Sequence, residues 1–262
     1  MSPPLNRIPS DERLPAQADV VVIGGGVIGV SAAYHLAKKG LSVALIEKGH
    51  VGAEQSSRNW GWCRQQGRAR AEIPLAREAL RLWEDMQAEA GVDAGFRRTG
   101  VLFLTKNPEE LAAWEKWAAI AREQQVHSTV LSPAEVAERM PGNTDRWVGG
   151  LHTPSDGRAE PSMAVPALAI AARKHGITIH QDCAARGLET EGGRASAVVT
   201  EKGTIRTGAV LLAGGAWSSL FCRRHGIELP VGLVNATACR TTPAPEITSA
   251  TIPAGSRPRT LR

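Results

Sequence analysis

The sequence predicts an α/β fold, and three observations lead to this prediction. The apolar run at residues 20–23 has the length of a buried strand and stops at a Gly-x-Gly-x-x-Gly turn. A helix-like segment and a second apolar strand follow, and that strand ends in Glu47. Much later, residues 209–213 repeat the buried-strand pattern and stop at two glycines. This order is typical of a Rossmann-like dinucleotide-binding domain.

Each glycine of the turn has a separate expected role. Gly24 permits the tight passage from strand to helix, and Gly26 lets the backbone approach a pyrophosphate closely. Gly29 lets the helix pack against the strand. The helix covers residues 32–39 with Gly40 at its end, and its N-terminus offers N–H groups and a positive dipole end to phosphates.

The second strand, residues 42–46, places Glu47 where an acid accepts both hydroxyl protons of a ribose. A 2′-phosphate would be repelled by this carboxylate, so the sequence disfavours NADP. The alternative interpretation is a plain βαβ unit with turn glycines and a solvated Glu47. The sequence has all five features of the nucleotide-binding unit in the expected order and spacing: strand, glycines, helix, second strand and acid. This agreement favours nucleotide binding.

The remaining elements alternate between helices and short strands, and no internal repeat is present. Residues 49–67 form a long irregular loop, a feature that is usually functional in a compact domain. Ser132-Pro133-Ala134-Glu135 is a capping box that begins a short helix. Helices are expected at 74–90, 108–126 and 161–175, and strands at 100–104, 149–153, 177–180, 187–191, 195–200 and 204–207. The tail, residues 241–262, shows no periodicity and predicts no element.

Composition excludes several classes of function. The net charge of +5 suits anionic ligands, but basic residues do not cluster with aromatics, so nucleic acid is not an expected partner. The cysteines at 63, 183, 222 and 239 form no Cys-x-x-Cys pair, so neither a zinc site nor another metal site, nor a dithiol redox pair, is indicated. Residues 1–17 predict a flexible leader without the apolar core of a secretion signal. No segment is long and apolar enough to span a bilayer. The scattered cysteines suit a reducing compartment, so we expect a cytoplasmic protein, with peripheral attachment to the inner membrane face as the alternative.

Four stretches in this order carry a family resemblance: residues 21–29 with Glu47-Lys48, residues 52–61, residues 156–161 and residues 210–218. Through them the chain resembles the FAD-dependent amine and D-amino-acid oxidoreductases, which include D-amino-acid dehydrogenase, glycine oxidase and sarcosine oxidase. The resemblance runs from about residue 19 to about residue 242.

The resemblance implies an FAD site. The glycine turn would face the pyrophosphate, the acid would hold the ribose, and the residue at 185, Ala where the family usually has Val, would read the adenine edge through its main chain. The implied cofactor-binding residues are Gly24, Gly25, Gly26, Val27, Ile28, Gly29, Glu47, Lys48, Ser56, Ser57, Trp60, Gly61, Ala185, Ala213 and Gly214.

Some of these residues have a second interpretation. Ser56 and Ser57 would bond the pyrophosphate or the flavin side of the cofactor, but hydroxyls also recur in solvated turns. Trp60 and Trp62 would run near the isoalloxazine ring, but buried packing is an equal alternative.

The implied reaction is hydride transfer from the substrate α-carbon to flavin, followed by hydrolysis of the resulting imine. No side chain accepts a hydride, so a cofactor is required. A substrate carboxylate commonly binds an arginine, and Arg64 on the flavin-side loop is the candidate, with a structural arginine as the alternative. The substrate would be a small amine or amino acid, and the electron acceptor either oxygen or a quinone or electron-transfer protein.

The resemblance also implies an interleaved α+β substrate domain built on an antiparallel sheet. The expected organisation is a leader at 1–17, FAD-binding parts at 18–92 and 153–222, and substrate-domain parts at 93–152 and 223–262. Because family members are longer, we expect a C-terminally truncated chain whose substrate domain is incomplete.

Two other classes of function stay open at this stage. An NAD-dependent dehydrogenase is disfavoured because residues 209–216 supply a second nucleotide-contacting strand end and no His/Asp proton relay is apparent. A non-catalytic dinucleotide-binding subunit, completed by a partner subunit, is the other alternative.

Overall fold

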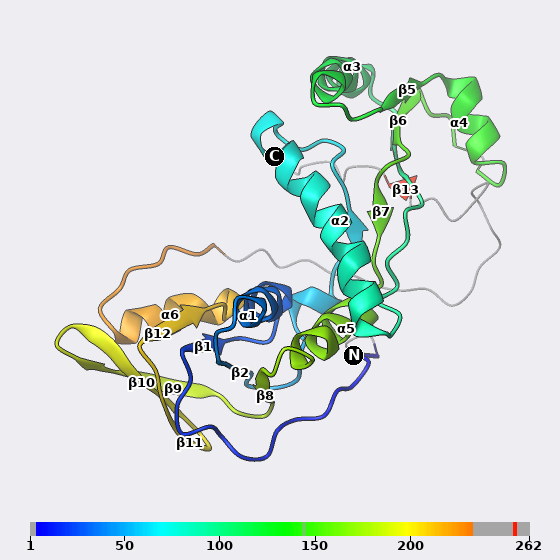
Figure 1. Ribbon diagram of the computed structural model, residues 1–262. Helices are drawn as coiled ribbons and strands as arrows, with labels where there is room; N and C mark the ends of the chain where they lie inside the picture. The colour runs from blue at the N-terminus through cyan, green and yellow to red at the C-terminus, as the bar shows by residue number, and fades with distance from the viewer. Residues whose placement is uncertain (1–3, 144, 233–253, 256–262) are drawn as a thin grey trace. The chain divides into compact units, whose positions relative to one another are not determined.

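The computed structural model describes residues 4–143, 145–232 and 254–255 of the chain (Figure 1). It divides into two compact units that alternate along the sequence. Unit 1 comprises residues 1–60, 86–94 and 160–240, and unit 2 comprises residues 61–85, 95–159 and 241–262. The expected interleaving of two structural units is therefore present, while the finer domain borders stay a prediction.

Unit 1 is built on a four-stranded parallel sheet in the order β12-β1-β2-β8. Both central strands are buried along their whole length, as is typical of parallel strands covered on two faces. Helix α1 packs against helix α5 beside this sheet (Figure 1). The elements are β1 (Val20–Ile23), α1 (Val27–Lys38), β2 (Val43–Ile46), α5 (Pro161–Arg173), β8 (Thr178–His180) and β12 (Ala209–Leu212).

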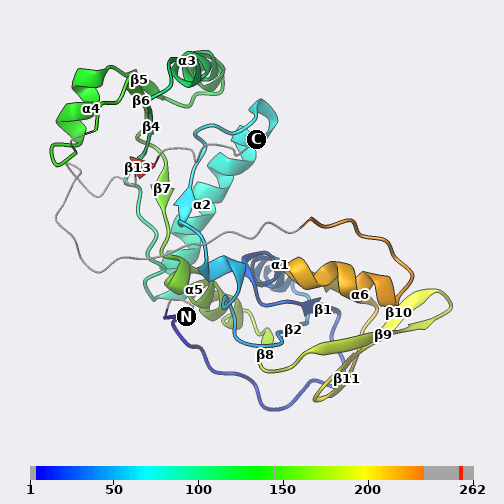
Figure 2. The same ribbon diagram turned by 180° about the vertical axis from the view of Figure 1, so that it is seen from behind.

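An antiparallel ribbon covers part of the sheet (Figure 2). The ribbon comprises β9 (Ala185–Glu191), β10 (Arg194–Thr200) and β11 (Gly203–Arg206), and its first turn uses Gly192 and Gly193, both at positive φ. Its buried Val198 and Ile205 pack on the apolar side chains of β1 and β2. The chain then continues through β12 into η3 (Gly215–Trp217) and α6 (Ser218–Arg224).

The described part of the predicted leader lies against unit 1. The carboxylate of Asp11 accepts from the Ile179 amide at 2.7 Å and from the Arg173 guanidinium at 3.1 Å. The Asn6 amide donates to the Ser162 carbonyl at 3.1 Å, and Ile8 is buried. These contacts attach residues 6–11 to β8 and α5.

Unit 2 contains the antiparallel sheet, in which β6 (Gly149–Thr153) pairs with β4 (Val101–Thr105) and with β5 (Thr129–Leu131). A two-residue strand, β13 (Ala254–Gly255), pairs in parallel with β4 and corrects the expectation that the tail forms no element. A strand of two residues pairs through its main chain and is too short to show the alternation of apolar and polar side chains that identifies a strand in a sequence. The rest of the predicted tail, residues 241–253 and 256–262, lies outside the described residues, as do residues 233–240.

Two helices of unit 2 have side-chain caps at their N-termini, and the second of these caps was predicted from the sequence. Asn107 caps α3 by accepting from the Glu109 amide, and Ser132 with Glu135 forms the predicted capping box of α4. Trp114 of α3 is only 4% exposed, because it packs on Phe103 of strand β4. The other elements of unit 2 are β3 (Trp62–Cys63), η2 (Arg70–Glu72), α3 (Pro108–Glu123), α4 (Pro133–Arg139) and β7 (Gly157–Arg158). The short helix η1 (Gln55–Ser57) belongs to unit 1, and α2 (Ile73–Ala90) begins in unit 2 and ends in unit 1.

Candidate nucleotide site

The glycine turn after β1 is held by the strands on both sides. The Gly24 amide donates to the Ile46 carbonyl, and the Ala213 amide donates to the Ile23 carbonyl, both at 2.8 Å. Gly24 adopts φ of +114°, and a Cβ there would lie 2.4 Å from the Ala213 carbonyl oxygen. Only glycine fits this position, because the neighbouring atoms belong to backbone that cannot rotate away.

Glu47 binds the glycine turn directly. Its carboxylate accepts from the Gly25 amide at 2.7 Å and from the Gly49 amide at 2.8 Å. The side chain is only 8% exposed, so these two hydrogen bonds satisfy a nearly buried charge. A carboxylate accepts about four hydrogen bonds, which leaves acceptor capacity for the hydroxyls of a sugar.

Ser56 lies at the start of α1, although it stands far from that helix in the sequence. Its hydroxyl oxygen accepts from the Val27 amide at 2.9 Å. Ser57 is turned elsewhere: both its amide and its hydroxyl donate to the Glu54 carbonyl at 3.1 Å. Ile28 is 70% exposed on the first turn of α1, where N–H groups without a partner inside the helix suit an anion.

Lys48 and Trp217 meet beside the turn. The Lys48 ammonium lies 4.1 Å from the centroid of the Trp217 ring and 2.7 Å from a carboxylate oxygen of Glu54. The other oxygen of Glu54 lies 3.1 Å from the Arg58 guanidinium. The sequence assigned no role to Trp217 or Glu54, although a tryptophan shortly after the strand end that the resemblance assigns to the nucleotide was a visible signal.

The other predicted residues are distributed over both units. Ala213 and Gly214 follow β12 and lie against Gly24, whereas Ala185 opens β9 and pairs with Thr200. Trp60 is exposed at the border of unit 1, and Gly61 begins the next segment of unit 2. The structure thus brings together the glycine turn, Glu47, Ser56, Ala213 and Gly214.

Arg64 belongs to a buried polar network in unit 2. It donates to the Gln66 carbonyl, and its guanidinium carbon lies 5.3 Å from the Phe103 ring centroid. The fully buried Asp156 carboxylate accepts from the amides of Gln65 at 2.8 Å and Gln66 at 2.9 Å. Burial raises the pKa of Asp156 despite these donors. The side-chain amide of Gln66 has no hydrogen-bond partner among the described residues.

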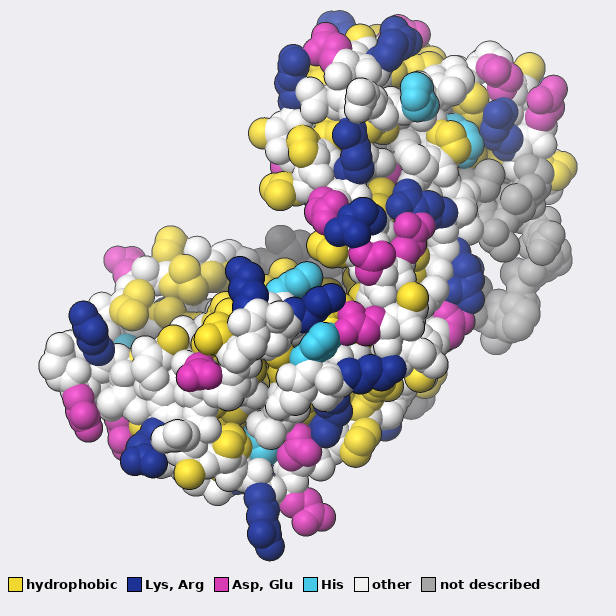
Figure 3. Space-filling view, in the orientation of Figure 1, with side chains coloured by type: hydrophobic (Ala, Val, Ile, Leu, Met, Phe, Trp, Pro, Cys, Tyr) yellow, Lys and Arg dark blue, Asp and Glu magenta, His cyan; other side chains and the backbone are white. Residues whose placement is uncertain are grey.

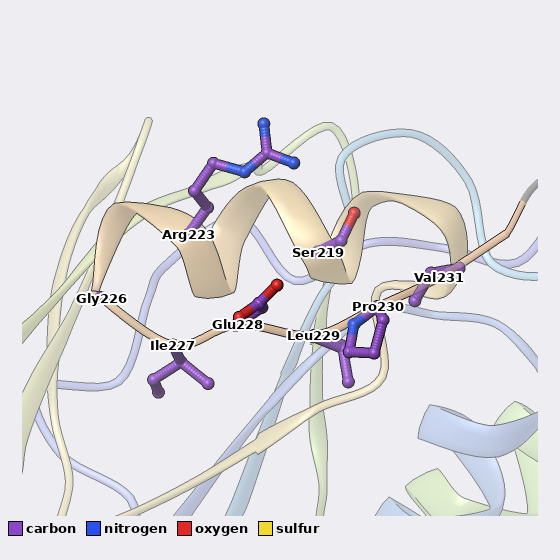
Figure 4. Close-up of a pocket in the computed structure, with 8 residues that line it drawn as sticks. All are labelled: Ser219, Arg223, Gly226, Ile227, Glu228, Leu229, Pro230 and Val231. Atoms are coloured by element: carbon purple, nitrogen blue, oxygen red, sulfur yellow. The ribbon is translucent and has the colours of Figure 1, made fainter.

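A separate groove runs along α6. Figure 4 shows residues 226–231 returning beside the helix, with Ser219 and Arg223 completing the lining. None of the predicted site residues lines it. Large hydrophobic side chains gather on the surface over α6 in Figure 3, and the exposed ones in this part of the chain are Trp217, Leu220, Ile227, Leu229 and Val231.

The described residues form neither a metal centre nor a membrane-spanning helix. No group of three or more His, Cys, Asp or Glu residues there is arranged to hold a metal ion. Within the same residues, no helix combines the length and the apolar character needed to cross a bilayer.

Comparison with known proteins decides the family. The family model DAO, FAD dependent oxidoreductase, matches residues 19–260. The chain belongs to this family of FAD-dependent oxidoreductases. The resemblance inferred from the four sequence stretches is thereby confirmed, and FAD, rather than NAD, is the cofactor of the family.

The chain spans only part of the length of the relatives that it matches. Mitochondrial sarcosine dehydrogenase of Mus musculus is 31% identical over 226 residues, which are 83% of this chain and 25% of that protein. Sarcosine oxidase subunit beta of Arthrobacter sp is 31% identical, over 81% of this chain and 55% of that one. The structure of L-amino acid deaminase from Proteus myxofaciens matches with a TM-score of 0.81 and 34% identity, covering 86% of this chain and 52% of the deaminase.

Proposed function

We propose that unit 1 binds FAD at the glycine turn, and that the protein oxidises the C–N bond of an amino acid or secondary amine. The observation that carries the proposal is the meeting of residues 24–29, Glu47 and Ser56 at one strand end. Backbone N–H groups and a helix N-terminus suit a diphosphate, and the carboxylate of Glu47 suits the adjoining ribose. The residues present therefore fit the adenosine diphosphate half of FAD.

The other cofactor contacts are proposed from the family resemblance. Ala213 and Gly214 border the turn from β12 and would approach the same phosphates. Ala185 would read the adenine through its main chain, whereas Trp60 and Gly61 would approach the flavin ring. Lys48 would lie near the ribose, and Ser57 would support the loop that presents Ser56.

Bound FAD would supply the group that accepts a hydride, which carries two electrons, and the protein would supply binding and orientation. For the substrate we propose Arg64, whose planar guanidinium matches a carboxylate. Its contacts with the Gln66 carbonyl and the Phe103 ring hold the side chain in one orientation. An Arg64→Lys variant distinguishes this role from a structural one, because a substrate-binding arginine changes KM with little change in the unfolding midpoint.

Relatives narrow the substrate class. They include sarcosine and dimethylglycine dehydrogenases, a 4-methylaminobutanoate oxidase, an L-proline dehydrogenase and glycine oxidases. The compounds in these enzyme names are all small carboxylic acids that carry an amine nitrogen. We therefore propose an N-methylated glycine or a small amino acid as the substrate.

The test has two stages. Protein incubated with FAD is freed of unbound ligand, and the flavin absorbance is recorded. The loaded protein is then mixed, without oxygen, with sarcosine, dimethylglycine, glycine, proline and other amino acids, and bleaching of the flavin is followed. Bleaching by one of these compounds supports the proposal. Folded protein that retains no FAD contradicts it.

A second candidate follows from the match to sarcosine oxidase subunit beta, a protein named as one subunit of an enzyme. In this alternative the chain binds the nucleotide but needs a partner subunit for turnover. Retention of FAD without bleaching by any amine favours it. Reoxidation by oxygen, compared with reoxidation by a quinone, identifies the electron acceptor, and cell fractionation tests the proposed cytoplasmic location against the inner membrane face.

A further inference from the structure

Two chain segments flank the glycine turn from opposite sides. In the sheet order β12-β1-β2, residues 213–217 follow the strand on one side of β1, and residues 47–58 follow the strand on the other side. Neighbouring strands lie about 4.8 Å apart, so the ends of β12 and β2 are separated by about 10 Å. The side chains of Lys48 and Trp217 span this distance and meet, with 4.1 Å between the ammonium and the ring centroid.

The position of this contact relates it to ligand binding. In open α/β sheets, ligands bind in the crevice outside the carboxyl ends of the strands. Lys48 comes two residues after β2 and Trp217 comes five residues after β12, so both project from that end of the sheet. The residue before Lys48 is Glu47, which binds the Gly25 amide of the turn. The contact therefore lies beside the part of a dinucleotide that Glu47 would hold.

The charge of Lys48 is matched within the protein. Glu54 accepts from the ammonium at 2.7 Å, and its second oxygen pairs with Arg58 at 3.1 Å. Glu54 lies two residues before Ser56, whose hydroxyl contacts the Val27 amide at the start of α1. One ion pair thus connects the residue beside Glu47 to the loop that carries Ser56.

The contacts of Lys48 with Trp217 and Glu54 are partly exposed to solvent, so each is a weak interaction that forms and breaks reversibly. Trp217 is 43% exposed, and the side chains of Lys48 and Glu54 are also partly exposed. An exposed cation–π pair changes an equilibrium constant by about two- to fivefold, and an exposed ion pair by a similar or smaller factor. A contact of this strength delays release of a ligand without closing the site permanently.

We propose that Lys48, Glu54 and Trp217 form a clasp across the glycine turn that slows the release of FAD. This inference rests on the proposed function, since it requires FAD to bind at the turn. The clasp acts on dissociation of FAD, because none of its three side chains is proposed to contact the substrate.

The experiment measures the rate of FAD release. Protein loaded with FAD is diluted into buffer, and the rise of flavin fluorescence is followed for wild type, Lys48→Met, Trp217→Leu and the double variant. Methionine keeps the length of the lysine stem while removing the charge. We expect each single variant to release FAD about two- to fivefold faster, and the double variant to release it no faster than the quicker single variant.

The chain offers a matched control in unit 2. In unit 2, Lys106 lies 5.1 Å from the centroid of the Trp147 ring and 2.9 Å from a carboxylate oxygen of Asp145, so a lysine again contacts one tryptophan and one acid. Lys106→Met should release FAD at the wild-type rate. Lys48→Arg, which keeps a cation over the ring, should also stay near wild type.

Each of the following outcomes overturns the clasp. Release rates could be unchanged in both single variants, or the effects could add in the double variant. Lys106→Met could have an equal effect, or the flavin could stay attached when the protein is unfolded. A variant whose ligand-free unfolding midpoint falls while its release rate stays at the wild-type value assigns the trio a structural role and also overturns it. Failure of wild type to retain FAD is seen before any variant is made, and it removes the proposed function as well.

Discussion

Replacing Gly29 by alanine tests how tightly the turn is packed. A Cβ at this position would lie 1.9 Å from the Gly24 carbonyl oxygen, whereas real Cβ atoms essentially never approach within 3.0 Å of another heavy atom. The backbone must therefore move by more than 1 Å. Gly24 resists this movement because its amide is bonded to the Ile46 carbonyl at 2.8 Å.

The expected loss follows from two opposing terms. Overpacking costs about 1–3 kcal/mol and occasionally more, and a contact this short belongs at the upper end. Alanine in a helix gains back about 1 kcal/mol relative to glycine. The net destabilisation is about 2 kcal/mol, which corresponds to a fall of about 4–8 °C in the unfolding midpoint of a chain of this size.

The assay is thermal unfolding followed by circular dichroism, with and without FAD. Gly208→Ala is the matched control, because Gly208 has an ordinary φ and a Cβ there would meet no atom within 4 Å. Gly29→Ala should also bind FAD at least about tenfold more weakly, since it displaces the carbonyl and amides of the turn. A midpoint and an FAD affinity equal to those of Gly208→Ala would refute the packing argument.

The remaining predictions concern two buried carboxylates, Glu47 and Asp156, and the half-buried thiol of Cys63. Glu47→Gln turns an amide NH₂ toward a backbone donor of the turn, so isothermal calorimetry should find ADP binding weakened by about tenfold; unchanged affinity would contradict the geometry. Burial raises the pKa of Asp156 above its usual 3.8, so the folded state holds the carboxyl proton more tightly than the unfolded chain does. The stabilisation that follows from this proton is complete below the usual pKa and is lost as the pH rises through the raised pKa. Urea unfolding at several pH values should therefore show a smaller decline for Asp156→Asn than for wild type, and identical slopes would argue against it. Burial raises the pKa of the Cys63 thiol to about 12, so peptide mapping should find it unmodified by iodoacetamide at neutral pH until the protein is unfolded, and rapid labelling of folded protein would disprove this.

The sequence by itself determined the βαβ unit, its glycine turn and the acid after the second strand. These features depend on local requirements: a positive φ at Gly24, close packing at Gly29, and apolar strands that must be buried on both faces. The capping box at Ser132 belongs to the same class, because it depends on residues three positions apart. Four motifs in order were also sufficient to identify the family.

Only the tertiary structure decided which residues meet. Ser56 reaches an amide 29 positions before it, and Asp156 binds an amide 91 positions before it. Neither the sequence period nor residue type encodes such pairs, because the loops that close them have many conformations and the packing of the sheet selects one. The same reason explains why Trp217 and Glu54 carried no assigned role, and why the pairing of Ala254 with β4 left no mark in the sequence.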